Sequence, residues 1–380
     1  MIKRLLTALL AFALLLLCGC EKSYDDTSFG IYFDEESDYS KNESKKSEDS
    51  SNGESSKIES SKDESKEDSK PAADSPLRVH FINVEQGDSI FIEMPNGKCM
   101  LIDSGEWDYA GRVITFIDCL GYKKIDYLIA THPHSDHIGG MQRIIDNFDI
   151  GKVYMPDIVT DTTLYLNLLK AIEAKGKGIN LVSVGKKITI GDVWATFVAP
   201  KTIVEDFNNC SAVLHLTYGE KSFLFTGDAE MEEELTITDN IDCDVLKVGH
   251  HGSYTSSCDA FLKKASPEIA IISCGKGNEY GHPHDAAINR LKKAGVEKIY
   301  RTDISGTITV STGGKRLTVK EGTAPSGYKW VLNISGKKLH TLECDGATEM
   351  KTENRAYSKR TLAELKAHGY VLCGNCNPTE

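Results

Sequence analysis

The 380-residue sequence has no excess of basic residues, since 44 Lys and Arg stand against 56 Asp and Glu, for a formal net charge of −12. This balance argues against a broad positive surface for nucleic acid, although it leaves room for a local basic groove. No stripe of aromatic and basic residues that could stack single strands is evident. The cysteines between Cys99 and Cys274 show no disulfide-framework spacing, which predicts small buried side chains.

A long apolar run occurs within residues 1–20, where two basic residues precede the stretch 8–17. The run is too short for a stable membrane span and is typical of a secretory signal peptide. Its end, Leu17-Cys18-Gly19-Cys20, resembles the lipobox of bacterial lipoproteins, which implies cleavage before Cys20 and a lipid on its sulfur. An ordinary signal peptide that ends in cysteine is the alternative. We therefore expect an extracytoplasmic protein, lipid-anchored to the cell membrane through Cys20.

Composition divides the rest of the chain into three segments. Residues 21–76 are mostly Ser, Lys, Asp and Glu and hold most of the excess negative charge. Because such a segment buries almost nothing, it is predicted to be a solvated tether. Residues 77–320 are rich in apolar runs and form the predicted main domain. The composition changes again after Pro325, and residues 327–380 are predicted to be a small separate module.

The main domain mixes short β-rich runs with longer amphipathic ones. Its first three predicted strands form a meander, and later strands alternate with helices. We therefore expect an α/β fold in which two mixed sheets pack together with helices outside. Amphipathic spacing predicts helices around residues 111–120, 138–148, 164–175, 230–235 and 285–294.

Three histidines and an aspartate crowd into THPHSDHIGG, residues 131–140, directly after an apolar strand. His132 and His134 leave the strand on one side, where two imidazoles can hold one metal ion. Asp136 and His137 follow at the start of the next helix and point toward a second position. Nitrogen and carboxylate ligands of this kind suit zinc, with manganese or iron as alternatives. An exposed histidine run without function would leave these residue types unexplained, because each would need a buried partner.

The stretch HPHSDHIGG resembles the His-x-His-x-Asp-His motif of the metallo-β-lactamase fold. Further matches follow in the expected order: IDSG at 102–105, TGD at 226–228, GHHGS at 249–253 and YGHPH at 280–284. With VEQGDS and NNCSAVLHL, residues 77–320 look like the hydrolase domain of ComEC-type DNA-uptake proteins. The resemblance implies an αββα sandwich that carries one or two divalent metal ions, zinc or manganese, at one edge. It implies no nucleotide cofactor.

The family pattern implies a role for each matching residue. His132 and His134 would hold the first ion. Asp136 and His137 would serve the second, and Asp228 would bridge the two. An aspartate in a turn before a helix is the plainer reading of Asp228.

The last ligand is open between two places. The resemblance favours His282 as the ligand, with His250 and His251 as catalytic residues that protonate the leaving oxygen; the reverse assignment is the alternative. Asp103 is expected to orient a ligand histidine rather than to touch metal.

Two departures from the family pattern affect the site. Where many members place another histidine, this chain has Asn208 and Asn209, whose amide oxygens are weaker ligands. Glu85 stands where relatives usually read Gly-Gln-Gly-Asp, and its carboxylate is expected near the entrance. Because the amide oxygens of Asn208 and Asn209 are weak ligands, the first metal site is expected to bind its ion loosely or to be filled by water.

A metal-activated hydroxide would attack phosphorus or a carbonyl carbon, with Asp136 or Asp228 orienting it. The histidine pair favours a phosphodiester, with nucleic acid as one candidate, because a lactam or thioester would not need that pair. Lys247 and Arg301 are candidates for phosphate contacts, and exposed ends of strands are the alternative reading of both. The alternatives are a hydrolase of another ester, lactam or phosphocholine group, and a binding module without catalysis.

The C-terminal module, residues 327–380, contains the pairs His340-x-x-x-Cys344 and Cys373-x-x-Cys376. Two such pairs can form a tetrahedral Cys₃His zinc site, and so short a domain needs a cross-link. The segment resembles the zinc-binding module of Ada-type repair proteins, with histidine in place of the first cysteine. A disulfide is the alternative outside the cell. A structural role, or recognition of nucleic acid or cell-wall phosphate, is expected.

Overall fold

The computed structural model describes residues 75–379 except 323–328, 334, 343, 349, 351–354, 359 and 368. The predicted signal peptide, the lipidation site and nearly all of the predicted tether lie outside the described residues. Among the helices of the described part, none is both long and apolar enough to cross a membrane.

The first sheet of the main domain has eight strands in the order β15-β14-β1-β2-β3-β4-β5-β6. Its strands are β1 (Leu77–Phe81), β2 (Ile90–Glu93), β3 (Cys99–Ile102), β4 (Lys124–Ile129), β5 (Asp149–Met155), β6 (Ile179–Leu181), β14 (Ile308–Thr312) and β15 (Leu317–Lys320). The strands β1 to β3 form the predicted antiparallel meander, and β3 to β6 are parallel.

The second sheet has seven strands in the order β13-β12-β11-β10-β9-β8-β7. Its strands are β7 (Lys187–Ile190), β8 (Val193–Ala199), β9 (Val213–Tyr218), β10 (Lys221–Phe225), β11 (Val245–Lys247), β12 (Ile269–Ile272) and β13 (Lys298–Arg301). Strands β10 to β13 are parallel, so their carboxyl ends lie at the same edge of the sheet.

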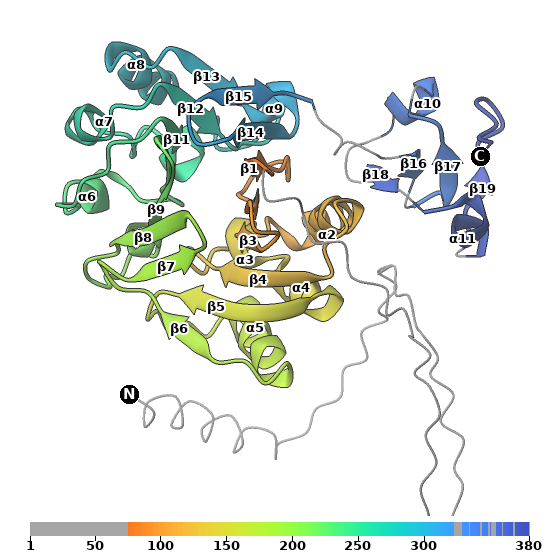
Figure 1. Ribbon diagram of the computed structural model, residues 1–380, viewed down its shortest axis with the longest axis horizontal. Helices are drawn as coiled ribbons and strands as arrows, with labels where there is room; N and C mark the ends of the chain where they lie inside the picture. The colour runs from red at the N-terminus through yellow and green to blue at the C-terminus, as the bar shows by residue number, and fades with distance from the viewer. Residues whose placement is uncertain are drawn as a thin grey trace, which may run out of the picture. The chain divides into compact units, whose positions relative to one another are not determined.

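The helices cover the outer faces of the two sheets (Figure 1). They are α2 (Ala110–Cys119), α3 (Ser135–Ile138), α4 (Met141–Asn147), α5 (Thr163–Ala174), α6 (Met231–Glu234), α7 (Asp259–Ala265), α8 (Asp285–Lys293) and α9 (Thr302–Ser305), with short 3₁₀ turns η1 (Trp107–Tyr109), η2 (Asn208–Cys210) and η3 (Gly249–Gly252). One apolar cluster fills the space between the sheets. A second joins the first sheet to α2, α4 and α5, and a third joins the second sheet to α7 and α8. The predicted sandwich of two mixed sheets between helices is confirmed.

Most predicted helices agree with the structure within a few residues, but the one expected over 138–148 is divided. The division falls at Gly139 and Gly140, which pack against the segment that follows β3. A Cβ on Gly140 would lie 2.9 Å from the Ser104 carbonyl oxygen. Helix α7 and the hairpin of β14 and β15 were not predicted, although the hairpin carries a Gly-Gly turn at 313–314.

The C-terminal module has a four-stranded sheet of order β18-β16-β17-β19. Its elements are β16 (Trp330–Asn333), β17 (Lys338–His340), α10 (Asp345–Thr348), β18 (Arg355–Ser358), α11 (Leu362–Ala367) and β19 (Val371–Leu372). Among its described residues, one small apolar cluster consists of Val331, Cys344, Ala347, Met350 and Cys373.

Candidate metal centre

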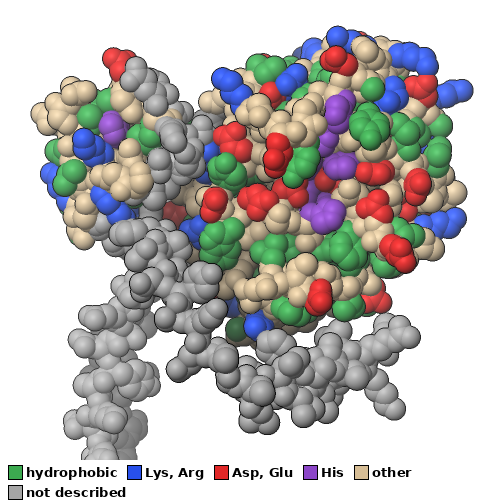
Figure 2. All heavy atoms as spheres, turned by 180° about the vertical axis from the view of Figure 1, so that it is seen from behind, with side chains coloured by type: hydrophobic (Ala, Val, Ile, Leu, Met, Phe, Trp, Pro, Cys, Tyr) green, Lys and Arg blue, Asp and Glu red, His purple; other side chains and the backbone are tan. Residues whose placement is uncertain are grey.

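The polar loops of the two sheets meet at one edge of the sandwich. The segment 131–137 follows β4, Asp228 follows β10, and residues 250–251 follow β11, so each lies beyond the carboxyl end of its strand. Ligand sites of α/β sheets commonly form at such ends. Figure 2 shows histidine side chains gathered on this face, with Asp and Glu side chains around them.

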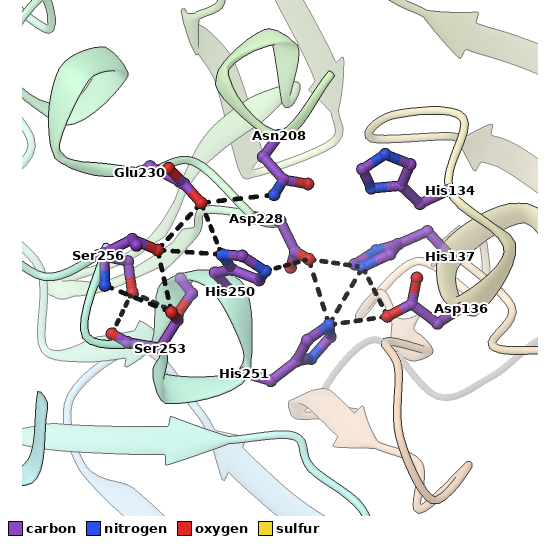
Figure 3. Close-up of polar contacts among 12 residues, drawn as sticks. His134, Asp136, His137, Asn208, Asp228, Glu230, His250, His251, Ser253 and Ser256 are labelled. Atoms are coloured by element: carbon purple, nitrogen blue, oxygen red, sulfur yellow. Dashed lines mark hydrogen bonds and ion pairs between the residues drawn. The ribbon is translucent and has the colours of Figure 1, made fainter. Parts of the chain in front are cut away.

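Two imidazole nitrogens and two carboxylate oxygens converge at the centre of this edge (Figure 3). The Oδ2 atom of Asp228 lies 3.2 Å from Nε2 of His137 and 3.2 Å from Nε2 of His251. Nε2 of His251 also lies 3.0 Å from Oδ2 of Asp136. The four donor atoms lie within 4.8 Å of one another, as the ligands of one ion do.

A second pair of imidazoles lies beside this group. Nε2 of His132 is 3.0 Å from Nδ1 of His134, and the same His132 atom is 3.9 Å from Oδ2 of Asp228. Asp228 therefore stands between the two groups. The structure thus brings His132 and His137 to the Asp228 carboxylate, with His134 beside His132 and Asp136 beside His251.

A buried carboxylate holds His137 from behind. Oδ2 of Asp103 lies 2.8 Å from Nδ1 of His137 and accepts a hydrogen bond of 2.6 Å from the Thr131 hydroxyl. The Thr131 amide donates to the other oxygen of Asp103. This contact leaves Nε2 of His137 to face the centre, which is how second carboxylates orient metal-binding histidines.

The carboxylates draw positive charge into the centre. Burial alone would lower the pKa of His251, but Asp228 and Asp136 raise it to about 10. The pKa of His137 is raised well above its usual range by Asp228 and Asp136, in spite of burial. Burial and the neighbouring His137 hold the pKa of His132 well below its usual value. Oδ1 of Asp228 is buried without a hydrogen-bond partner among the described residues. This donor set fits divalent cations, which supply the charge that the carboxylates attract.

His251 and His282 do not match their predicted places. His251, predicted to be catalytic, contributes Nε2 to the four-atom group, whereas His282, predicted to be the ligand, lies outside it. The two rings are 6.2 Å apart between centroids. The reason is local: the backbone at His250 and His251 is left-handed, with φ of 47° and 53°, and this turn directs the second histidine inward. His251 therefore has the geometry of a ligand, as the reverse assignment implied, whereas His250 lies outside the four-atom group.

His250 lies between the four-atom group and a glutamate (Figure 3). Its Nδ1 lies 2.9 Å from Oε1 of Glu230, and its Nε2 is 4.0 Å from Oδ2 of Asp228. Burial raises the pKa of Glu230, but hydrogen bonds from His250 and Thr255 outweigh this and lower it. Sequence reasoning missed Glu230 because it reads as part of the acidic start of α6. Its position two residues after Asp228 was the available signal.

Asn208 and Asn209 differ in what their amides can do. Oδ1 of Asn209 accepts from the backbone amides of Glu230 and Glu233, so this oxygen is taken up at the start of α6. Asn208 donates weakly to Glu230, and its Oδ1 atom has no hydrogen-bond partner in the described part of the chain. Of the two predicted weak ligands, Asn208 alone has a free buried oxygen.

The phosphate contact predicted for Lys247 is contradicted by its burial, and Arg301 is already paired with a carboxylate. Lys247 is fully buried, and its ammonium lies 2.7 Å from Oδ2 of Asp88. Arg301 is paired with Asp303 at 2.6 Å. Both cations neutralise carboxylates of this chain, which sequence spacing could not reveal. Glu85 is paired with Arg112 at 3.3 Å, so its charge is partly compensated.

The second cluster of metal-ligand type lies in the C-terminal module. His340, Cys344, Cys373 and Cys376 each offer a donor atom, and these atoms lie within 4.8 Å of one another. Nδ1 of His340 is 3.3 Å from Sγ of Cys344. The three thiols are free in the structure. Three sulfurs and one imidazole are a donor set typical of structural zinc.

Comparison with known proteins adds a family and several relatives. Residues 82–276 match the model of the metallo-beta-lactamase superfamily. ComE operon protein 3 of Bacillus subtilis is 32% identical over 259 residues, which are 63% of this chain and 33% of that protein. Competence protein ComA of Neisseria gonorrhoeae is 29% identical over 238 residues, 60% of this chain and 31% of that protein. The chain thus spans about a third of the length of these relatives.

Among solved structures, the metallo-beta-lactamase fold protein YhfI from Bacillus subtilis is similar to this chain. It is 16% identical, with a TM-score of 0.42, and the match covers 60% of this chain and 97% of YhfI.

Proposed function

The chain belongs to the metallo-beta-lactamase superfamily and is a metal-dependent hydrolase, and from this premise we propose that it cleaves phosphodiesters. One relative, from Neisseria gonorrhoeae, is named competence protein ComA, which supports nucleic acid as the first candidate substrate. The observation that carries the proposal is His250, which lies beside the four-atom group and is held by Glu230.

We assign the ions to two neighbouring positions. His132 and His134 serve the first, Asp136, His137 and His251 serve the second, and Asp228 lies between them. When bound, divalent ions lower the pKa of water toward neutrality and neutralise charge that develops on the substrate. Zinc suits this mixture of nitrogen and carboxylate donors, with manganese as the alternative.

His250 is proposed to protonate the departing oxygen. Glu230 holds its Nδ1, so its Nε2 faces the edge where Asp228 lies. An imidazole oriented in this way can donate a proton to an alkoxide, a step worth about 100-fold to 10,000-fold in rate. An alkoxide of a sugar is a poor leaving group and needs that proton, whereas opening a strained lactam depends on it less.

A substrate panel tests the proposal. The mature chain, loaded with zinc or manganese, is assayed on bis-p-nitrophenyl phosphate, single-stranded DNA, nitrocefin and an aryl phosphocholine. Turnover of the first two supports a phosphodiesterase, and DNA turnover distinguishes a nuclease. Cleavage of nitrocefin or phosphocholine alone would reassign the substrate. Absence of turnover with two ions bound would favour a binding module.

We also propose that the C-terminal module binds one structural zinc ion through His340, Cys344, Cys373 and Cys376. Its support is the donor set and the small apolar cluster around it. Elemental analysis of the full chain should then find one zinc that resists mild chelation. A module that folds without zinc and forms a disulfide would contradict this.

The place of action is proposed from residues 1–20 alone. A lipid on Cys20 would hold the enzyme at the outer side of the cell membrane. Cys20→Ser should release the protein from the membrane fraction or leave its precursor uncleaved. A protein that fractionates unchanged would argue against the anchor.

A further inference from the structure

A basic groove lies apart from the metal centre. It is a cavity of about 510 Å³. Four of its lining residues are cationic, namely Lys221, Lys298, Lys315 and Arg316, and one, Glu268, is acidic. The remainder form an apolar floor: Ile269, Tyr300, Leu317 and Val319. The whole chain has a net charge of −12, so this local excess of cations does not follow from the overall composition.

The groove and the metal centre lie at opposite ends of the strands. Lys221 begins β10, whereas Asp228 follows the end of that strand, and Lys298 begins β13. A strand of five residues spans roughly 17 Å, so the two sites are distinct but close enough for one extended chain to reach both. None of the proposed metal ligands lines the groove, and neither does the proposed proton donor His250.

Three of the cations are available to a ligand. Lys221 is held by Asp244 at 2.5 Å. Lys298, Lys315 and Arg316 are exposed, and among the described residues their side chains form no hydrogen bond or ion pair. Such side chains bind phosphate at a smaller cost than cations that must first leave a carboxylate.

The floor adds apolar contact to this charge. Tyr300, Leu317 and Val319 are partly buried against the core between the sheets, and each still lines the groove. Apolar and aromatic surface beside cations is the combination that binds single strands of nucleic acid. The sequence hides it because its members come from β10, β13 and the hairpin of β14 and β15.

Protection of sheet edges is a competing explanation. Strands β13 and β15 are the terminal strands of their sheets, where lysines prevent pairing with other chains. Lys315 and Arg316, however, lie in the turn before β15 and not on its paired backbone. Edge protection does not require cations there.

We propose that this groove binds the phosphate groups of a phosphodiester chain and serves as a second contact for the substrate. The role of the groove as a substrate contact rests on the proposed function. Binding in the groove, however, can be measured in the absence of catalysis. Its ligand chemistry is a row of phosphates beside apolar groups, which an oligonucleotide offers.

The test compares two charge-matched variants. Lys315→Gln with Arg316→Gln alters the groove, and Lys263→Gln with Lys292→Gln removes two exposed lysines from α7 and α8. Each is made in full-length protein carrying His250→Ala, which protects the probe. Binding of a fluorescent oligothymidylate and of linear polyphosphate is measured by anisotropy across salt concentrations.

The groove variant should weaken oligothymidylate binding by at least about fivefold, and its salt slope should fall by about 1.4 for two lost phosphate contacts. The control should change affinity by less than about twofold. If polyphosphate binds as tightly as oligothymidylate, charge alone accounts for binding in the groove. If polyphosphate binds more weakly, the apolar floor also contributes to the affinity for oligothymidylate. Equal losses in both variants, no binding by the parent, or self-association with unchanged affinity would each overturn the proposal.

Hydrolysis separates this inference from the proposed function. With His250 present, the groove variant should hydrolyse bis-p-nitrophenyl phosphate at the parent rate, because that small substrate does not reach the groove. If the parent hydrolyses no phosphodiester yet binds oligothymidylate through Lys315 and Arg316, the proposed function fails and the groove stands.

Discussion

The metal centre and the Cys/His cluster use histidine in different structural settings. In the main domain, one apolar cluster holds the two sheets together and two others join the sheets to helices, and the proposed ligands lie at the edge of that framework. In the C-terminal module, Cys344 and Cys373 are members of the apolar cluster itself. The donor sets differ too, since the first contains carboxylates and the second three sulfurs. From this difference we expect that loss of the ions abolishes hydrolysis in the main domain without unfolding it, whereas loss of zinc unfolds the C-terminal module.

The sharpest challenge to this comparison is Asp228→Asn. The change removes charge from both proposed ion positions but leaves the apolar framework intact. Hydrolysis should fall about a thousandfold or more, since several kcal/mol of charge stabilisation are lost. Elemental analysis should show fewer ions in a protein whose circular dichroism is unchanged. Asp242→Asn, on the exposed surface, is the matched control; an active Asp228→Asn would refute the assignment.

His250→Ala should have the next largest effect, because the proposed proton donor is lost without loss of an ion. We expect about a hundredfold slower cleavage of DNA. Bis-p-nitrophenyl phosphate should be affected much less, since its leaving group needs no proton. Glu230→Gln should show the same pattern to a smaller degree. His215→Gln serves as control, and equal losses on both substrates would remove His250 from this role.

Lys247→Met examines the support beneath the centre. Asp88 would lose its buried partner, which costs about 3–5 kcal/mol of stability. Oδ1 of Asp88 also lies 3.6 Å from Nδ1 of His251, so affinity for the second ion should fall about tenfold. Thermal unfolding and activity titrated with zinc measure the two effects. Adding Asp88→Asn should recover part of the stability; an unchanged melting temperature in Lys247→Met would contradict the buried pair.

Cys373→Ser with Cys376→Ser should have the smallest effect on hydrolysis. Activity should stay within about twofold of the parent, while one zinc ion is lost and the module unfolds. Hydrogen exchange in β16 and β17 measures that unfolding. If activity falls with the zinc, the two regions are not independent, and the comparison drawn above breaks down.

The sequence allowed accurate prediction wherever chemistry is local. The crowding of His132, His134, Asp136 and His137 identifies a metal site because strand and helix geometry fix where these side chains point. The roles of His251 and His282 depend on a left-handed turn that composition does not encode.

Long-range pairs were beyond such reasoning. Lys247 ends β11 of the second sheet, whereas Asp88 lies far away in sequence, in the loop before β2 of the first sheet. Lys247 therefore reads as a surface cation although it is fully buried. The basic groove was missed for the same reason. Packing of the two sheets, rather than spacing along the chain, creates these contacts.

The left-handed backbone of His250 and His251 lowers the conformational stability of the protein but places both imidazoles at the site. Each such non-glycine residue costs about 1–2 kcal/mol, and no relief is available while both imidazoles are needed. A glycine at position 250 would relax the turn at that residue and give a more stable but less active protein, whereas a glycine at 251 would also leave the buried Asp228 without one of its partners. Selection for heat tolerance alone should therefore favour glycine at position 250, and selection for turnover should restore histidine there.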